Sequence, residues 1–338
     1  MKKTTDRRAR ALLPASTRTQ ARVVLFQPTK RPTRRSGEWQ TSADGKRRVR
    51  VTGRLGQRHA DVLEAICATA IAMRSIDDGG VELIVDPYRV RRCMGAGRGR
   101  WGSYSKEQTQ VLLADLCSAL IEIRTPRLDA QGYHAIGHLI DHWVPAEDGV
   151  IDPRMTVDPL TGNQRSLWRV RLGVVLTELI RVDGKLWRDP EPIAALRSGA
   201  SQALARHVLT HSFDPPGGWW LDTLLDAVGV AVGGQARKQA RRAVRDDAKG
   251  LAVLGITVQN GRVSTAREGI QPPGRVSAAT LEGVQPPGEG VQPPGEGVQP
   301  PGECSSIQYP QVLTGGPLEG RPLQIKSTDS AIPAHPMP

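Results

Sequence analysis

Apolar residues in the middle of the chain follow a pattern that changes from helical spacing to alternation and back. Asp86-Pro87 is typical of the first residues of a helix, and Ser103 or Ser105 can cap the helix that follows. The predicted elements, in chain order, are a helix over Gly56–Ser75, a strand over Val81–Val85, a helix over Tyr88–Met94, a helix from about Ser103, and strands over Ile121–Thr125 and Tyr133–Val144. This order is typical of a winged-helix domain, which we place at residues 46–145.

The same order repeats after a stretch rich in Asp, Pro and Gly, residues 146–165, which we interpret as a linker. We predict a strand over Leu167–Leu172, helices over Gly173–Val182, Gly199–His211, Leu221–Val228 and Ala236–Leu254, a short strand over Lys185–Trp187, and a hairpin of Ile256–Val258 with Arg262–Ser264. Asn260-Gly261 is a preferred tight turn for such a hairpin. The sequence therefore predicts an α+β protein with two tandem winged-helix domains, 46–145 and 166–266, flanked by disordered tails at 1–45 and 267–338.

The positive charge is concentrated at the start of the chain. Residues 1–50 hold 15 Lys and Arg against three acidic residues, which matches the net charge of +12 for all 338 residues. Such a basic arm is typical of proteins that bind polyanions, and it lacks the amphipathic apolar face that membrane binding needs. Nucleic acid is the preferred partner, and a solvated tail is the alternative.

One segment of the arm does not fit disorder. Gln20–Phe26 is apolar at its end and contains one of the two Phe residues of the chain. It faintly resembles peptides that bind sliding clamps. The alternative is a local strand that packs on the first domain.

The predicted helix 236–254 carries most of the candidate DNA contacts. Its basic residues recur at helical spacing along one side, opposite an apolar side. The second helix of a helix-turn-helix enters the major groove, where Arg and Lys reach phosphates and guanine edges. The candidates are Arg237, Lys238, Arg241, Arg242, Arg245 and Lys249, with Arg262 in the following hairpin. A solvated helix face is the alternative.

The first domain offers a weaker set of candidate contacts. Ser105, Lys106 and Gln108 lie at the start of its reading helix, and Arg98 and Arg100 lie between glycines in the preceding loop. Glycines let a backbone approach phosphates closely. The glycine pattern superficially resembles a dinucleotide-binding loop, but it follows a predicted helix rather than a strand, so we expect no cofactor.

Enzyme motifs are missing from the sequence. There is no Gly-x-x-x-x-Gly-Lys-Ser/Thr, no His-hydrophobic-His triplet of a nicking enzyme and no defensible carboxylate cluster of a nuclease. His134, His138 and His142 recur every four residues without further ligands, and the four cysteines are scattered. His207 and His211 share the same spacing on an apolar helix and are interpreted as core or interface residues. We expect no enzyme activity, no cofactor and no metal, and, without a long apolar stretch or signal peptide, a cytoplasmic protein associated with nucleoid or plasmid.

Residues 268–302 contain a seven-residue repeat, Glu-Gly-Val/Ile-Gln-Pro-Pro-Gly. Its prolines and glycines are incompatible with a coiled coil, and the glycine period does not fit collagen. Seven codons span 21 base pairs, about two turns of duplex at ~10.5 base pairs each, so copies would present one face of the DNA. The repeat is either a set of DNA sites encoded inside the gene or a protein linker.

With this domain order, residues 49–265 resemble iteron-binding replication initiators of theta-replicating bacterial plasmids. The resemblance depends on the architecture and on stretches such as Ser166–Leu172 and Arg237–Gly255 followed by a hairpin. It implies binding to direct repeats at an origin, local melting, and recruitment of the host initiator and replicative helicase. It also implies a possible homodimer, with dimerisation and backbone contacts in the first domain and reading of the repeat in the second.

Two other functions remain open. A winged-helix transcriptional regulator would bind a palindromic operator as a stable dimer. A partition or packaging adaptor would act through protein contacts and show little preference for a DNA sequence.

Overall fold

A computed structural model describes residues 11–95, 104–146, 156–157, 162 and 164–266. They belong to one compact unit, Met1–Pro273; the second unit, Gly274–Pro338, lies outside the described residues, as does the predicted 267–338 tail with its repeat. The elements are β1 (Ser16–Thr17), α1 (Arg18–Arg22), β2 (Arg35–Thr41), β3 (Arg48–Gly53), α2 (Gln57–Thr69), β4 (Ala72–Ser75), β5 (Val81–Val85), α3 (Pro87–Cys93), α4 (Lys106–Ser118), β6 (Leu120–Arg124), α5 (Pro126–Asp129), β7 (Ala135–Gly137), β8 (Ile140–Pro145), β9 (Trp168–Leu172), α6 (Val174–Val182), β10 (Lys185–Leu186), α7 (Glu191–Ala194), α8 (Gly199–Val208), β11 (Trp219–Trp220), α9 (Leu221–Ala227), α10 (Gly234–Asp246), α11 (Ala248–Val253), β12 (Ile256–Gln259) and β13 (Arg262–Thr265). Helices and antiparallel sheets are mixed, so the α+β class is confirmed at that level.

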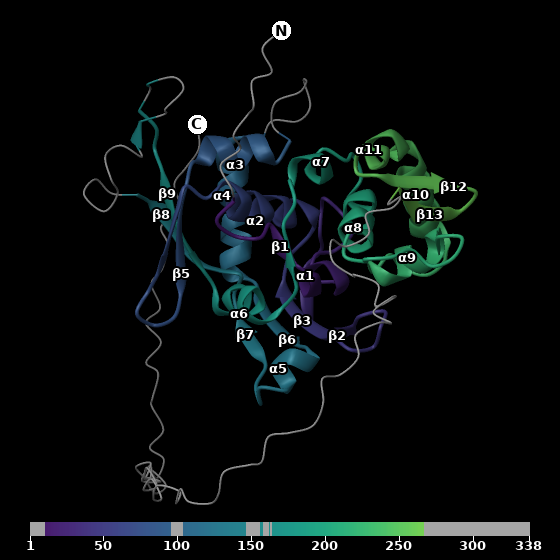
Figure 1. The fold of residues 1–338 in the computed structure, drawn as a ribbon, viewed down its shortest axis with the longest axis horizontal. Coiled ribbons are helices and arrows are strands. Elements are labelled where there is room, and N and C mark those ends of the chain that lie inside the picture. Colours follow the sequence, from purple (N-terminus) through teal and green to yellow (C-terminus); the bar gives the residue numbers. More distant parts are fainter. Residues whose placement is uncertain (1–10, 96–103, 147–155, 158–161, 163, 267–338) are drawn as a thin grey trace, which may run out of the picture. The chain divides into compact units, whose positions relative to one another are not determined.

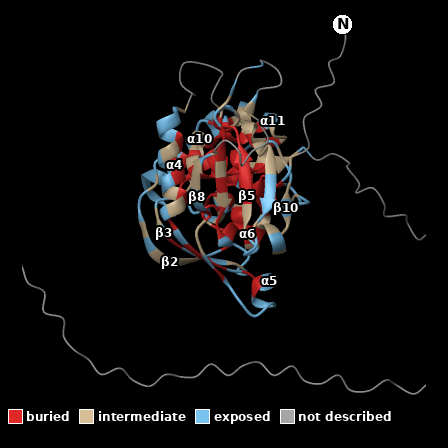
Figure 2. Cartoon of the chain, turned by 90° about the vertical axis from the view of Figure 1, so that its left-hand side faces the viewer, coloured by how far each residue is buried: buried red, intermediate tan, exposed pale blue. Residues whose placement is uncertain are grey.

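The N-terminal lobe, β1 to β10, is built on two four-stranded antiparallel sheets, β2-β3-β6-β7 and β4-β5-β9-β8, with helix α2 (Figure 1). Strand β3 illustrates why a strand forms here: Val49 and Val51 are buried, while the residues between them are exposed. Helix α2 joins the same core through Leu63, and the core continues to Leu179 in α6. Buried residues lie inside the lobe and exposed ones outside, as Figure 2 shows.

The predicted boundary between the domains is wrong. Strand β9, which the sequence pattern places in the second domain (166–266), pairs with β5 and β8 and completes a sheet of the first lobe. Its Trp168 and Val170 are buried in the core of that lobe, as is Leu179 of the next helix. The alternation in Leu167–Leu172 predicted a strand correctly but carried no information about which sheet it joins. Most of the predicted linker, 146–165, lies outside the described residues.

The prediction of a disordered arm over residues 1–45 is wrong from residue 11 onward; residues 1–10 lie outside the described range. β1, α1 and β2 are regular elements, and Thr17 caps α1 in a reciprocal capping box with Gln20. Leu25 and Phe26 pack in the N-terminal core, with Leu25 fully buried. A peptide buried in this way is not exposed for a sliding clamp, so the packing alternative holds, although the segment forms no strand.

Some elements of the first lobe differ from the prediction because their residues pair with strands elsewhere in the lobe. Helix α2 ends at Thr69, and Ala72–Ser75 pairs with β5 as strand β4. The two strands predicted between residues 121 and 144 divide between sheets, because β6 pairs with β7 while β8 pairs with β9. The predicted start of α3 is confirmed, with the Asp86 carboxylate accepting from the Tyr88 amide at 2.8 Å.

The C-terminal lobe, α7 to β13, has its own core, which runs from Ile193 to Val263. Its elements follow the order helix α8, strand β11, helix α9, helix α10 and hairpin β12–β13, and the strands form a sheet ordered β11-β13-β12. The predicted hairpin is confirmed, with Asn260 in the left-handed region (φ 49°) at the turn. The predicted long helix is interrupted at Asp247, whose buried carboxylate accepts from the Arg197 and Ser198 amides at the start of α8.

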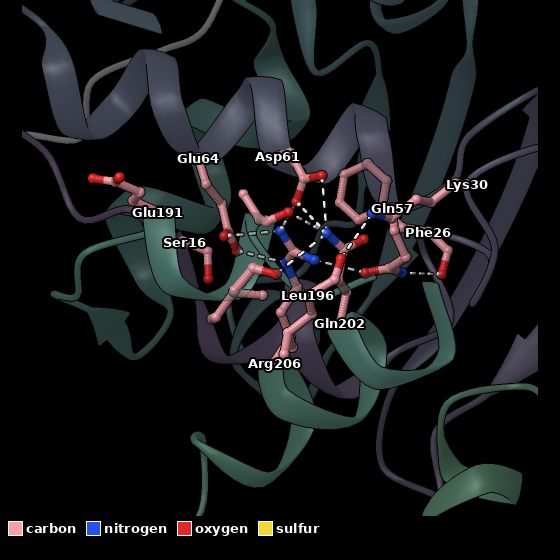
Figure 3. A network of polar contacts seen from close by, with 12 residues as sticks. Ser16, Phe26, Lys30, Gln57, Asp61, Glu64, Glu191, Leu196, Gln202 and Arg206 are labelled. Atoms are coloured by element: carbon pink, nitrogen blue, oxygen red, sulfur yellow. Dashed lines mark hydrogen bonds and ion pairs between the residues drawn. The ribbon is translucent and has the colours of Figure 1, made fainter. Parts of the chain in front are cut away.

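A buried ion-pair network joins the two lobes (Figure 3). Arg206 of α8 donates to Asp61 Oδ1 at 2.7 Å, to Glu64 Oε1 at 3.1 Å and to Gln57 Oε1 at 2.7 Å, all on α2. Burial alone would lower the pKa of Arg206, but the negative charges of Glu64 and Asp61 outweigh burial and raise this pKa. Burial raises the pKa of Asp61, whereas in Glu64 two arginines outweigh burial and lower the pKa. The network therefore requires both lobes to be in place.

His207, next to this network, is expected to make the fold sensitive to acid. Burial, the neighbouring His211 and then Arg22 lower the pKa of His207 to about 4 from an ordinary 6.5. Between these values the unfolded chain holds the extra proton, so stability is fully present above pH 6.5 and is lost as pH falls toward 4. We expect a loss of about 2–3 kcal/mol in the free energy of unfolding between pH 7 and 4.5, measured by urea titration. The variant His207→Gln should show a flatter pH profile, and an unchanged profile would contradict the assignment.

Candidate nucleic-acid interface

Helix α10 presents a basic stripe outside the C-terminal core. Its Ala240 and Val244 are buried against the core, which orients the helix. Three basic side chains of α10 and one of α11 are exposed at positions that share one side: Lys238, Arg242, Arg245 and Lys249. We call these four residues the α10 stripe. Three cations of α10 and one of α11 can neutralise phosphates of a duplex while some reach base edges.

Arg237 does not belong to the α10 stripe, contrary to the sequence prediction. Only 4% of the residue is exposed. Its guanidinium donates to the Asp222 carbonyl oxygen at 3.0 Å and forms an ion pair with Asp226, both on α9. Arg237 therefore fastens α10 to α9, a role that helical periodicity does not distinguish from DNA contact.

Arg241 and Arg242 have partners in the protein. Arg241 makes a bidentate pair with Asp222, both distances being 2.6 Å, and this hydrogen bonding raises the pKa of Arg241 and lowers that of Asp222. Arg242 lies 3.7 Å from Asp246 and its side chain is 86% exposed. Exposed pairs of this kind stabilise a protein little, so Arg242 can exchange its partner for a phosphate at small cost.

Arg262 is half-buried at the start of strand β13, within the C-terminal hairpin. Its guanidinium lies 3.3 Å from the ring centroid of Trp220 and donates to the Gly218 carbonyl oxygen at 3.2 Å. Trp220 is 56% exposed, so this stacked pair is accessible from solvent at the edge of the C-terminal sheet. The structure thus brings Arg262 into the same lobe as the α10 stripe.

The candidate DNA contacts of the first lobe differ in whether their side chains already have partners in the protein. Ser105 and Gln108 form a reciprocal capping box at the start of α4, so their side chains already have partners in the backbone. Lys106 is exposed on the first turn of that helix. Arg98 and Arg100 lie outside the described residues. Of this set, Lys106 retains an uncommitted charge in the part of the chain that the structure describes.

A basic groove beside α10 was missed by the sequence prediction. It has a volume of about 970 Å³ and is bounded by segment 24–41, by the start of α8 and by Gln239 and Ala243 of α10. Lys30 and Arg35 line it, and burial lowers the pKa of both, that of Arg35 to about 10. Lys30 Nζ donates to the Leu196 carbonyl at 2.8 Å. Lys30 and Arg35 belong to the N-terminal basic segment. Because that segment was predicted to be disordered, nothing in the sequence was a reason to place them beside α10.

Metal and membrane sites receive no support from the described residues. Within them, no group of three His, Cys, Asp or Glu side chains could hold a metal ion, and no helix is long and apolar enough to cross a membrane. His138 Nδ1 lies 3.0 Å from the Ala119 carbonyl oxygen, and His134 Nε2 lies 3.4 Å from Glu122. The regular spacing of the histidines thus corresponds to separate local contacts.

No protein-family model and no curated protein matches the chain. Among solved structures, a crystal structure of RctB domains 2–3 is similar to it, with a TM-score of 0.41 and 10% sequence identity, covering 73% of this chain and 94% of that chain. A likeness of this size decides nothing about function, which is therefore argued from the residues.

Proposed function

We propose that this protein is a DNA-binding replication initiator of a bacterial plasmid, which binds direct repeats at the origin through its C-terminal lobe. The observation that carries DNA binding is the α10 stripe, Lys238, Arg242, Arg245 and Lys249, which is exposed on α10 and the start of α11 while Ala240 and Val244 of α10 are buried. In this proposal the lobe acts as a winged helix, with α10 in the major groove and the β12–β13 hairpin as the wing. The order of its helices and strands supports that reading.

The initiator role is supported by the sequence rather than by the α10 stripe. In this proposal the seven-residue repeat at 268–302 is encoded by direct repeats of 21 base pairs, whose copies would face one side of the duplex at ~10.5 base pairs per turn. An initiator binds such direct repeats, helps to melt the adjacent DNA and recruits the host initiator and helicase. A transcriptional regulator would instead bind a palindrome.

Footprinting tests the proposal directly. The full chain is mixed with DNA that spans its own gene and flanking sequence, and protected bases are mapped with and without competitor DNA. We expect protection at a regular spacing over direct repeats, either in the 3′ end of the gene or upstream. A plasmid that lacks the gene should be maintained when the protein is supplied in trans. Protection of a single palindrome, with no effect on maintenance, would favour the regulator and refute the initiator.

A further inference from the structure

A second surface with nucleic-acid chemistry lies on the N-terminal lobe, on the outer face of the sheet β2-β3-β6-β7. The alternating residues Val49, Val51, Ile121 and Ile123 turn inward and are buried. Their neighbours turn outward, and the register places them in rows across the strands: Trp39 beside Arg50, Glu122 and Ile136, and Arg48 beside Arg124. In Figure 1 the four strands lie side by side.

Trp39 is surrounded by three guanidinium groups. The guanidinium carbon atoms (Cζ) of Arg48, Arg50 and Arg124 lie 4.9, 5.2 and 5.2 Å from the ring centroid of Trp39. Cations at this distance are attracted to the face of an indole ring. The arrangement holds an aromatic ring and planar guanidinium groups together on one open sheet face, where β2 is coloured mainly as intermediate or exposed in Figure 2.

The charge on this face is positive. Glu122 is the acidic member of the rows, and its side chain is 5% exposed beneath its partners Arg50 and Arg124. Three arginines against one carboxylate leave two positive charges in these rows. Arg48 is exposed and has no ion pair among those the structure gives. An anionic chain therefore complements the face.

Apolar side chains continue the face beside the arginines. Leu120 and Ile136 are 46% and 47% exposed, and they line a hollow of about 130 Å³ together with Gly37 and Thr52. Gly37 has φ +94°, and a Cβ there would lie 2.8 Å from Thr52 Oγ1, so a side chain at this position would intrude on the hollow. Flat apolar groups fit such a hollow, and a basic rim would hold the chain that carries them.

We propose that this sheet face binds single-stranded DNA, with bases stacked on Trp39 and the arginine planes and with phosphates paired to Arg48 and Arg124. Surfaces that bind single strands combine these two elements, a stacking platform and a track of cations. A duplex keeps its bases stacked internally and cannot use the platform. The proposal does not depend on duplex binding by the α10 stripe.

Fluorescence anisotropy with a labelled oligothymidine of about 16 nucleotides tests the proposal on the full chain. We expect binding by the wild type, and about tenfold weaker binding by Trp39→Leu and by Arg48→Glu, since stacking on one aromatic ring contributes roughly a factor of ten or more. Arg48→Glu changes an exposed side chain and serves if Trp39→Leu fails to fold. The charge-matched control Lys185→Glu, exposed on β10, should bind as the wild type does.

Two further measurements make the outcome decisive. The double variant Lys238→Glu/Arg242→Glu should keep its affinity for oligothymidine, which separates this face from the α10 stripe. Cross-linking to bromodeoxyuridine-substituted DNA should label the peptide that contains Trp39. Absence of binding by the wild type, unchanged affinity in both sheet variants, or tighter binding of oligouridine than of oligothymidine would overturn the proposal.

Discussion

Replacing Arg206 by alanine is expected to lower the free energy of unfolding by about 3–5 kcal/mol, the usual loss when one partner of a buried ion pair is removed. The side chain of Arg206 is 5% exposed, and those of Asp61 and Glu64 are 0% and 4% exposed. The substitution therefore removes the Arg206 guanidinium from two buried carboxylates. Glu64 keeps Arg188 at 2.6 Å, whereas Asp61 keeps an amide of Gln202 at 3.2 Å. Urea unfolding at pH 7, followed by circular dichroism, measures the loss.

The carboxylates also determine how the Arg206→Ala variant responds to pH and to second substitutions. A buried carboxyl without a counter-charge has a raised pKa, so the deficit of the variant should shrink as pH falls and the group takes up a proton. The double variant Arg206→Met/Asp61→Asn should recover part of the loss, because it removes the unpaired buried charge while Glu64 keeps its ion pair with Arg188. Arg181→Ala is the matched control and should cost less than ~1 kcal/mol, because the Arg181 side chain is 58% exposed and Glu178 keeps the hydrogen bond from the Tyr133 hydroxyl at 2.6 Å. Equal losses in Arg181→Ala and Arg206→Ala would refute a structural role for the network.

The contrast between these two arginines explains which parts of the fold could be predicted. Local signals were reliable: Asp86 before Pro87 marked a helix, and Asn260-Gly261 marked a hairpin, because cap and turn chemistry involve neighbours in sequence. The burial of Asp61 could not be predicted in this way. Its partner Arg206 lies 145 residues away, and without that contact a charged residue is normally assigned to the surface.

Long-range partners that the sequence does not reveal also explain which of the predicted DNA contacts are exposed and which are buried. Periodicity correctly put Lys238 and Arg242 on an exposed side of α10, but it put Arg237 there too. Arg237 turns inward because α9 presents Asp226 and a carbonyl oxygen where it can reach them. The alternation of Leu167–Leu172 likewise defined a strand without defining its sheet. The sequence thus predicts elements and amphipathic sides, while long-range polar partners decide which basic residues remain free for a ligand.

The double variant Lys238→Glu/Arg242→Glu is expected to weaken binding to the direct-repeat duplex by about 100-fold or more, since each specific contact of this kind is worth about 1–3 kcal/mol. Both side chains are exposed and neither is part of a core, so the fold should be retained. Removing two phosphate or base contacts should also reduce the slope of log affinity against log salt by about 1 per contact. Gel-shift titrations at several salt concentrations give both quantities.

Arg237→Gln provides the control that distinguishes contact from scaffold, because it removes a basic residue of the same helix that is 4% exposed. We expect this variant to lower the stability of the C-terminal lobe by about 1–3 kcal/mol through loss of charged hydrogen bonds. Its folded fraction should keep the salt slope of the wild type. The slope counts the cations that contact phosphate, so an unchanged slope in the Lys238/Arg242 variant would mean that these two side chains make no such contact. If Arg237→Gln changes the slope instead, α10 binds DNA with its other side or not at all.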